Sequence, residues 1–187
     1  VLLLPPRAVD GGVFAVWEAV GVARPAVVPP GPLCIAADLT WLEQEHMALL
    51  PPTLLRAFRD RARPPPGRRV APARLFVHGL GETAPAALLR AAEAEGYRPL
   101  DLRDLAPRDV LAAFAGATAI AGASGPDLDG IIFCAPGTKV LEIAPADRFL
   151  PFAWMISEKI GLLHAVLPGG APARFARLAS MLRNWEP

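Results

Sequence analysis

The sequence predicts an α/β protein with a mostly parallel sheet that is covered by helices on both faces. From residue 73 onward, short aliphatic runs alternate with longer Ala-, Leu- and Arg-rich stretches of helical period. This order is typical of a parallel sheet, because parallel neighbours need a helical crossover between them. The chain has 187 residues, of which 53% are hydrophobic. That is enough apolar surface for a sizeable core, and it excludes a wholly disordered protein.

Five apolar segments are predicted strands. The first, Ala73–Val77, reads ARLFV, and its aliphatic and aromatic side chains are typical of a buried strand. The predicted strands cover residues 73–77, 97–100, 117–121, 138–143 and 162–167. Crossovers between parallel strands are right-handed, so the loops that follow the strands should all lie at the edge formed by the strands' carboxyl ends.

The segments between these strands carry helix signals. In 86–95, Leu88, Leu89 and Ala92 form an apolar stripe, and Gly96 follows at a position that favours helix termination. A second helix should run from the segment 104–107 through Phe114. The other predicted helices cover residues 131–134, 149–160 and 172–184.

The first 70 residues are less regular. A helix is predicted within 50–63, and residues 1–4 and 26–28 could form strands. The Pro- and Arg-rich segment 64–70 is predicted to be a linker. The chain is thereby divided into an N-terminal segment (residues 1–63), the linker, and a Rossmann-like domain (residues 71–187). Because the sequence begins with Val1 and not with Met, we expect it to belong to a longer protein.

Composition excludes several classes of protein. The net charge of +1 argues against nucleic-acid binding through bulk charge. Cys34 and Cys134 lie far apart without a CxxC motif, which argues against a disulfide scaffold or a cysteine zinc site and favours a reducing compartment. No metal site is expected. No run of 18 apolar residues suggests a transmembrane helix.

The segment 122–133, GASGPDLDGIIF, follows the third predicted strand. Gly122 and Gly125 permit tight turns, Ser124 offers a hydroxyl, and the amides of a following helix could face an anion. These features indicate a phosphate cradle. The alternative is an ordinary strand-to-helix turn in which Asp127 or Asp129 caps the helix, and two carboxylates would repel a phosphate.

A second loop, His78-Gly-Leu-Gly, follows the first predicted strand. His78 could contact a diphosphate or act as a base near neutral pH, or it could be a half-buried turn residue. Because the loop matches neither GxGxxG nor a P-loop with its lysine, those two nucleotide motifs are excluded.

Glu142 lies in the apolar strand TKVLEI, where a carboxylate is costly unless it is paired or exposed. It could accept hydrogen bonds from ribose hydroxyls, or it could face solvent or pair with Lys139 or Arg148. His164 alone indicates no role. The mixed charges around Asp101 and Arg103 are interpreted as a solvated face.

These motifs together resemble glycosyltransferase family 61. The resemblance is carried by the run RLFV from Arg74, by Gly96-Tyr97, by the segment 120–133 and by APGTKVLEIAP, residues 135–145. It implies the C-terminal, donor-binding domain of a GT-B glycosyltransferase, with residues 1–63 as a remnant of the acceptor-side half. It also implies transfer from a nucleotide-sugar, with inversion and without a required metal.

The chain departs from the family pattern at several positions. Ser124, Pro126 and Gly130 stand where the family usually has His, Ala and Asn, and His78-Gly79 replaces Ser-Arg. Losing the loop arginine removes a bidentate diphosphate contact. The alternative is therefore a degenerate, non-catalytic scaffold or interaction domain.

The resulting hypothesis is a bacterial glycosyltransferase of polysaccharide assembly, with no catalytic residue assigned. Eight residues are predicted to bind the donor: His78, Gly79, Gly122, Ser124, Gly125, Asp127, Leu128 and Glu142. The expected partners are a nucleotide-sugar and a glycan acceptor, with no separate cofactor and no nucleic acid. The expected location is the cytoplasm, with peripheral association at the cytoplasmic face of a membrane left open.

Overall fold

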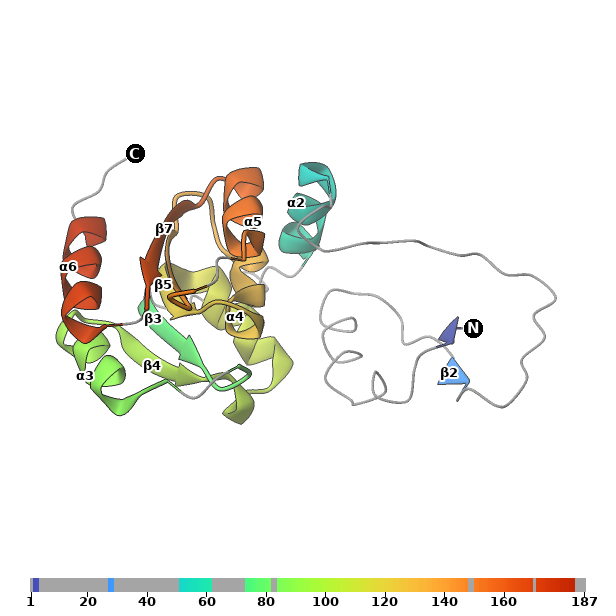
Figure 1. The fold of residues 1–187 in the computed structure, drawn as a ribbon. Helices are drawn as coiled ribbons and strands as arrows, with labels where there is room; N and C mark the ends of the chain where they lie inside the picture. The colour runs from blue at the N-terminus through green and yellow to red at the C-terminus, as the bar shows by residue number, and fades with distance from the viewer. Residues whose placement is uncertain are drawn as a thin grey trace.

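The computed structural model describes residues 2–3, 27–28, 51–61, 73–81, 84–147, 150–169 and 171–183. Its main feature confirms the predicted fold, because five strands form one all-parallel sheet (Figure 1). The strands are β3 (Ala73–His78), β4 (Arg98–Asp101), β5 (Ala117–Ala123), β6 (Lys139–Ala144) and β7 (Leu163–Pro168), in the spatial order β4-β3-β5-β6-β7. Separately, β1 (Leu2–Leu3) pairs in parallel with β2 (Val27–Val28).

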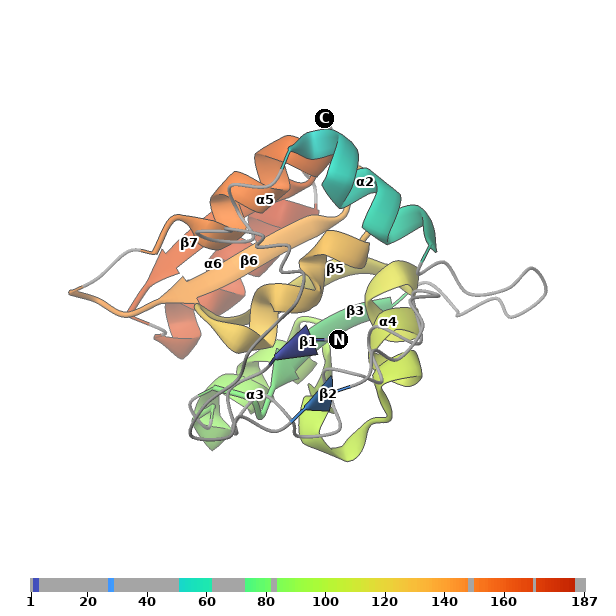
Figure 2. The same ribbon diagram turned by 90° about the vertical axis from the view of Figure 1, so that its right-hand side faces the viewer.

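Helices cover both faces of the five-stranded sheet, as Figures 1 and 2 show. The helices α3 and α6 lie together on one face, and α2, α4, η4 and α5 lie on the other. Their bounds are α2 (Pro52–Arg61), α3 (Ala86–Ala94), η3 (Leu102–Asp104), α4 (Pro107–Gly116), η4 (Pro126–Phe133), α5 (Phe152–Ile160) and α6 (Pro172–Arg183).

Strand residues alternate between two hydrophobic cores. Leu75 and Val77 of β3 belong to the core under α4, η4 and α5, whereas Phe76 between them belongs to the core under α3 and α6. Phe76 meets Phe175 of α6 edge-on, with ring centroids 5.8 Å apart. This alternation, which follows from the two-residue period of a strand, fixes which face each polar side chain of β5, β6 and β7 occupies.

The helix α2, which falls within the predicted N-terminal segment, packs against η4 and α5. Its Leu55 is fully buried in the core beneath those helices. The core of the sheet therefore includes residues that precede the predicted linker. The linker itself, 64–70, lies outside the described residues, and the proposed division of the chain stays a prediction.

The prediction for 122–134 was wrong in its boundaries. The strand β5 continues through Ala123, and a 3₁₀-helix, η4, spans the stretch that was expected to be mostly loop. Pro126 explains why η4 begins before the predicted residue 131. Its fixed φ suits the first helical position, and its missing N–H has no helical partner to lose there. Gly130 then lets η4 approach α4, because a Cβ at this position would lie 2.5 Å from the ring of Phe114.

The strands β4 and β7 form the two edges of the sheet. Pro99 lies within β4, opposite Phe76 of β3. Since proline has no N–H to give to a ladder, it is tolerated in an edge strand.

Candidate functional site

The strand order creates a switch point between β3 and β5. The chain leaves β3 through α3 to β4 on one side, and returns through α4 to β5 on the other side. The loops that follow β3 and β5 therefore diverge, and such a point at the carboxyl edge of a parallel sheet is where ligands bind. The two predicted loops, 78–83 and 122–129, begin here, and within them the stretches 78–81 and 124–127 meet.

A cleft of about 830 Å³ opens at this switch point. Three of the predicted donor-binding residues, His78, Ser124 and Asp127, line it, and Phe76 and Leu88 supply apolar wall. Residues 143–147, which follow from β6, also line the cleft. Its size and its mixture of apolar wall with few polar groups are typical of a small-molecule site.

Asp127 ties the two loops together. Its side chain is 1% exposed, and Oδ1 accepts hydrogen bonds from the amides of Leu80 at 2.7 Å and Gly81 at 3.3 Å. Its second oxygen, Oδ2, is buried and has no hydrogen-bond partner among the residues that the structure describes. A half-satisfied buried carboxylate is costly, so this oxygen is the most unusual polar atom in the cleft.

The contacts of Ser124 do not match the predicted phosphate cradle. Its amide donates to the carbonyl of Ile143 at 2.9 Å, and its hydroxyl donates to Glu142 Oε1 at 2.5 Å. Pro126, the first residue of η4, has no amide hydrogen. The amides that best resemble an anion-binding site belong to Leu80 and Gly81. Both already donate to the carboxylate of Asp127, so an external anion would have to compete with a side chain of the same protein.

Glu142 is neither exposed nor paired with Lys139, whose ammonium donates instead to the carbonyl of Arg183. It is 1% exposed, and its Oε2 lies 2.9 Å from Nε2 of His164 on β7. With Ser124 on its other oxygen, the carboxylate joins β5, β6 and β7 on the α5 face of the sheet. The carboxylate lies between serine and histidine, so this is not a nucleophilic triad, which needs the histidine in the middle.

His164 is the residue of this chain that sequence reasoning missed. Its side chain is 4% exposed, and in the strand register it lies opposite Val140, two residues before Glu142. Side chains two residues apart on neighbouring strands share a face and come within reach diagonally. The only signal in the sequence was a histidine in the strand next to a strand that carries a buried glutamate, and the register that pairs them comes from the structure.

Four more predicted residues do not line the large cleft. Gly125, Leu128 and Glu142 line a separate cavity of about 40 Å³ beside α5. Gly122 is buried, and a Cβ there would lie 2.8 Å from Cγ2 of Val77. The glycine is thus required for packing between β3 and η4, and its predicted role in donor binding has no support in its contacts.

A polar cluster of His78, Asp101 and Arg103 borders the cleft. Arg103 donates from Nε to Asp101 Oδ1 at 3.0 Å and from NH2 to Oδ2 at 2.5 Å, and His78 Nδ1 lies 4.0 Å from the same Oδ2. The hydrogen bonds from Arg103 hold the pKa of Asp101 well below its usual range. Gly79, with φ of +110°, packs against Asp101. A side chain at this position would clash, because its Cβ would lie 2.2 Å from Asp101 Oδ1.

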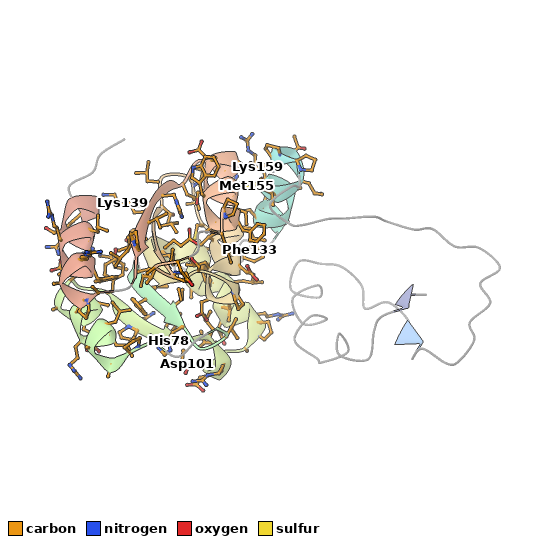
Figure 3. All side chains as sticks on the ribbon, in the orientation of Figure 1. His78, Asp101, Phe133, Lys139, Met155 and Lys159 are labelled. Carbon is orange, nitrogen blue, oxygen red and sulfur yellow. The ribbon has the colours of Figure 1, made fainter. Side chains whose placement is uncertain are left out.

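Figure 3 shows the position of this cluster. His78 and Asp101 lie together at the carboxyl ends of β3 and β4, far from Lys139 at the amino end of β6. The charged stretch agrees with the predicted solvated face in that the Arg103 side chain is 60% exposed, and it also places a carboxylate and a guanidinium beside the switch point.

Within the described ranges, no three His, Cys, Asp or Glu residues are grouped as metal ligands. None of the helices in those ranges combines the length and apolar character that crossing a membrane requires. Cys134 is buried, and burial raises the pKa of its thiol. Comparison with protein-family models and with curated proteins finds no match. The resemblance to glycosyltransferase family 61 accordingly stays a prediction that rests on the quoted motifs.

Proposed function

We propose that this chain is the donor-binding domain of a glycosyltransferase and that it binds a nucleotide-sugar at the switch point between β3 and β5. The observation that carries the proposal is the cleft of about 830 Å³ at that place. Clefts of several hundred Å³ suit ligands of this size. The motif resemblance through residues 135–145 supplies the choice of nucleotide-sugar from among the ligands that such folds bind.

The lining of the cleft supports a hydroxyl-rich ligand. The exposed Pro85, Pro126 and Pro145 offer apolar surface to ring faces. His78 and Asp127 supply polar groups. Following the resemblance, the proposed reaction is an inverting, metal-independent transfer to a glycan, with the catalytic base still unassigned. The proposed location is the cytoplasm, where reducing conditions suit the buried free thiol of Cys134.

A non-catalytic scaffold is the second candidate. The observation that favours it is the occupation of the Leu80 and Gly81 amides by Asp127. A site that uses its best anion-binding amides to hold its own carboxylate has fewer groups left for a diphosphate.

A thermal-shift screen with UDP, GDP and CMP separates the two candidates. A ligand that binds only the native state stabilises it by about 2.7 kcal/mol at a hundredfold excess over Kd, which raises the unfolding midpoint measurably. A rise with one nucleotide supports the transferase, and His78→Ala should reduce it because His78 lines the cleft. Midpoints unchanged by all three nucleotides would favour the scaffold.

A further inference from the structure

We propose that Asp127 is the hydroxyl acceptor of the cleft, binding a sugar-ring hydroxyl of the ligand through Oδ2. The inference rests on the proposed function, since it names the portion of the nucleotide-sugar that this side chain contacts. It assigns the recognition of a neutral hydroxyl to a residue that the sequence suggested for phosphate binding.

The two oxygens of Asp127 have different environments. Oδ1 is held by the Leu80 and Gly81 amides, which fix the orientation of the carboxylate. Asp127 is one of the residues that line the cleft, and its buried Oδ2 lacks a partner among the described residues. A ligand that donates a hydrogen bond to Oδ2 would satisfy the last acceptor of a group that is already oriented.

The residue beside Oδ2 on the facing loop is a glycine, Gly81. A Cβ at Gly81 would lie 3.2 Å from Oδ2 and 3.8 Å from the carboxyl carbon of Asp127. Gly81 does not have a positive φ, so backbone conformation does not require glycine at this position. Its lack of a side chain instead keeps the protein's own atoms from crowding Oδ2.

The charges around the cleft favour a hydroxyl over a phosphate at this point. Among the lining residues that the structure describes, the ionisable ones are Asp127, the exposed Asp147 and His78. A phosphate placed against Oδ2 would meet a like charge, and the nearby guanidinium of Arg103 is already bound by the carboxylate of Asp101. A hydroxyl donates to the carboxylate at no electrostatic cost, and vicinal ring hydroxyls are the donors that a nucleotide-sugar carries in greatest number.

The variant Asp127→Asn tests the inference. Asparagine keeps a carbonyl oxygen for the Leu80 and Gly81 amides, but it places an NH₂ donor where Oδ2 was. We expect the variant to keep the wild-type unfolding midpoint within a few degrees and to bind UDP or UDP-glucose at least tenfold more weakly by calorimetry. Asp129→Asn is the matched control, because it removes the same charge from an exposed position of η4 and should leave affinity unchanged.

The amide resonances of Leu80 and Gly81 provide a second readout, because they report directly on the Asp127 carboxylate. UDP, its 2′,3′-dideoxy analogue, UDP-glucose, free ribose and free glucose are titrated separately. Weaker binding of the dideoxy analogue assigns Oδ2 to the ribose. A loss in Asp127→Asn that is confined to UDP-glucose assigns Oδ2 to the transferred sugar. Either result supports the hydroxyl acceptor.

Three results distinguish failure of the hydroxyl acceptor from failure of the proposed function. If Asp127→Asn binds every probe as the wild type does, the inference is overturned while the proposed function stands. If no nucleotide binds but ribose or glucose shifts the two amides, the acceptor stands and the proposed function fails. If no probe shifts them, both are rejected. Should Asp127→Asn not fold, Gly81→Ala crowds Oδ2 with Asp127 intact, and wild-type affinity in that variant would overturn the inference.

Discussion

Asp127 and Glu142 are both buried carboxylates near the carboxyl edge of the sheet, but their surroundings differ. Each is 1% exposed. Both oxygens of Glu142 are engaged, one by Ser124 and one by His164. Asp127 has one oxygen held by backbone amides and the other without a described partner.

The difference indicates two uses for the same chemical group. A buried carboxylate whose acceptors are all satisfied within the protein adds nothing to ligand recognition, and its removal should affect folding. A buried carboxylate with a free acceptor in a cleft should affect binding more than folding. Substitutions at each carboxylate and at its neighbours distinguish the two uses.

Glu142→Ala should lower the free energy of unfolding by about 3–5 kcal/mol, because it leaves His164 and Ser124 without their acceptor in a buried place. Chemical denaturation monitored by circular dichroism measures the loss. Glu158→Ala, on the exposed surface of α5, is the control and should change stability by less than about 0.5 kcal/mol. Equal effects from the two variants would show that the Glu142 contacts contribute little.

Asp127→Ala should lower the free energy of unfolding by about 1.5–3 kcal/mol, because it removes the charged acceptor of the Leu80 and Gly81 amides. The freed amides should then accept an external anion. We expect inorganic phosphate to raise the unfolding midpoint of this variant more than that of the wild type. A phosphate response equal to that of the wild type would show that the two amides do not form an anion site.

Gly122→Ala should destabilise the protein by about 1–2 kcal/mol through overpacking, since its Cβ would approach Val77 and Leu128. Nucleotide affinity should not change, because Gly122 does not line the large cleft. Calorimetry with the nucleotide that responds in the thermal-shift screen is the measurement. Lost affinity with unchanged stability would restore the predicted binding role of this glycine.

Of these four substitutions, Asp101→Asn should have the smallest effect on folding stability, because it disturbs only the polar cluster with Arg103. The pKa of Asp101 is depressed in the folded state, so its ionised form contributes stability above the unfolded-state pKa of about 4 and loses that contribution as the pH falls toward the folded-state value. The difference in unfolding midpoint between wild type and variant should be constant above about pH 5 and should shrink below about pH 4. A difference that grows on acidification would contradict this assignment.

The strand and helix order could be predicted from the sequence because apolar periodicity and glycine or proline punctuation are local signals. They placed β3, β5 and β6 within a few residues of their observed bounds. The convergence of the loops at 78–81 and 124–127 followed from the general geometry of parallel sheets.

The partners of the site residues could not be predicted in the same way. Whether Asp127 meets Leu80 depends on two segments that are 47 positions apart in the chain, and the Glu142–His164 pair depends on the register of two strands. Gly122 carried an ambiguous signal, because a glycine needed for packing looks the same in a sequence as one needed for a ligand.

Pro99 has a consequence for the behaviour of the protein at high concentration. An edge strand can recruit a strand from another molecule, since its outer row of amides and carbonyls acts as a template for further pairing. In β4, the proline offers no donor to such a template, and the strand is four residues long. This edge is therefore protected against the sheet extension that begins fibrillar aggregation, independently of whatever the cleft binds.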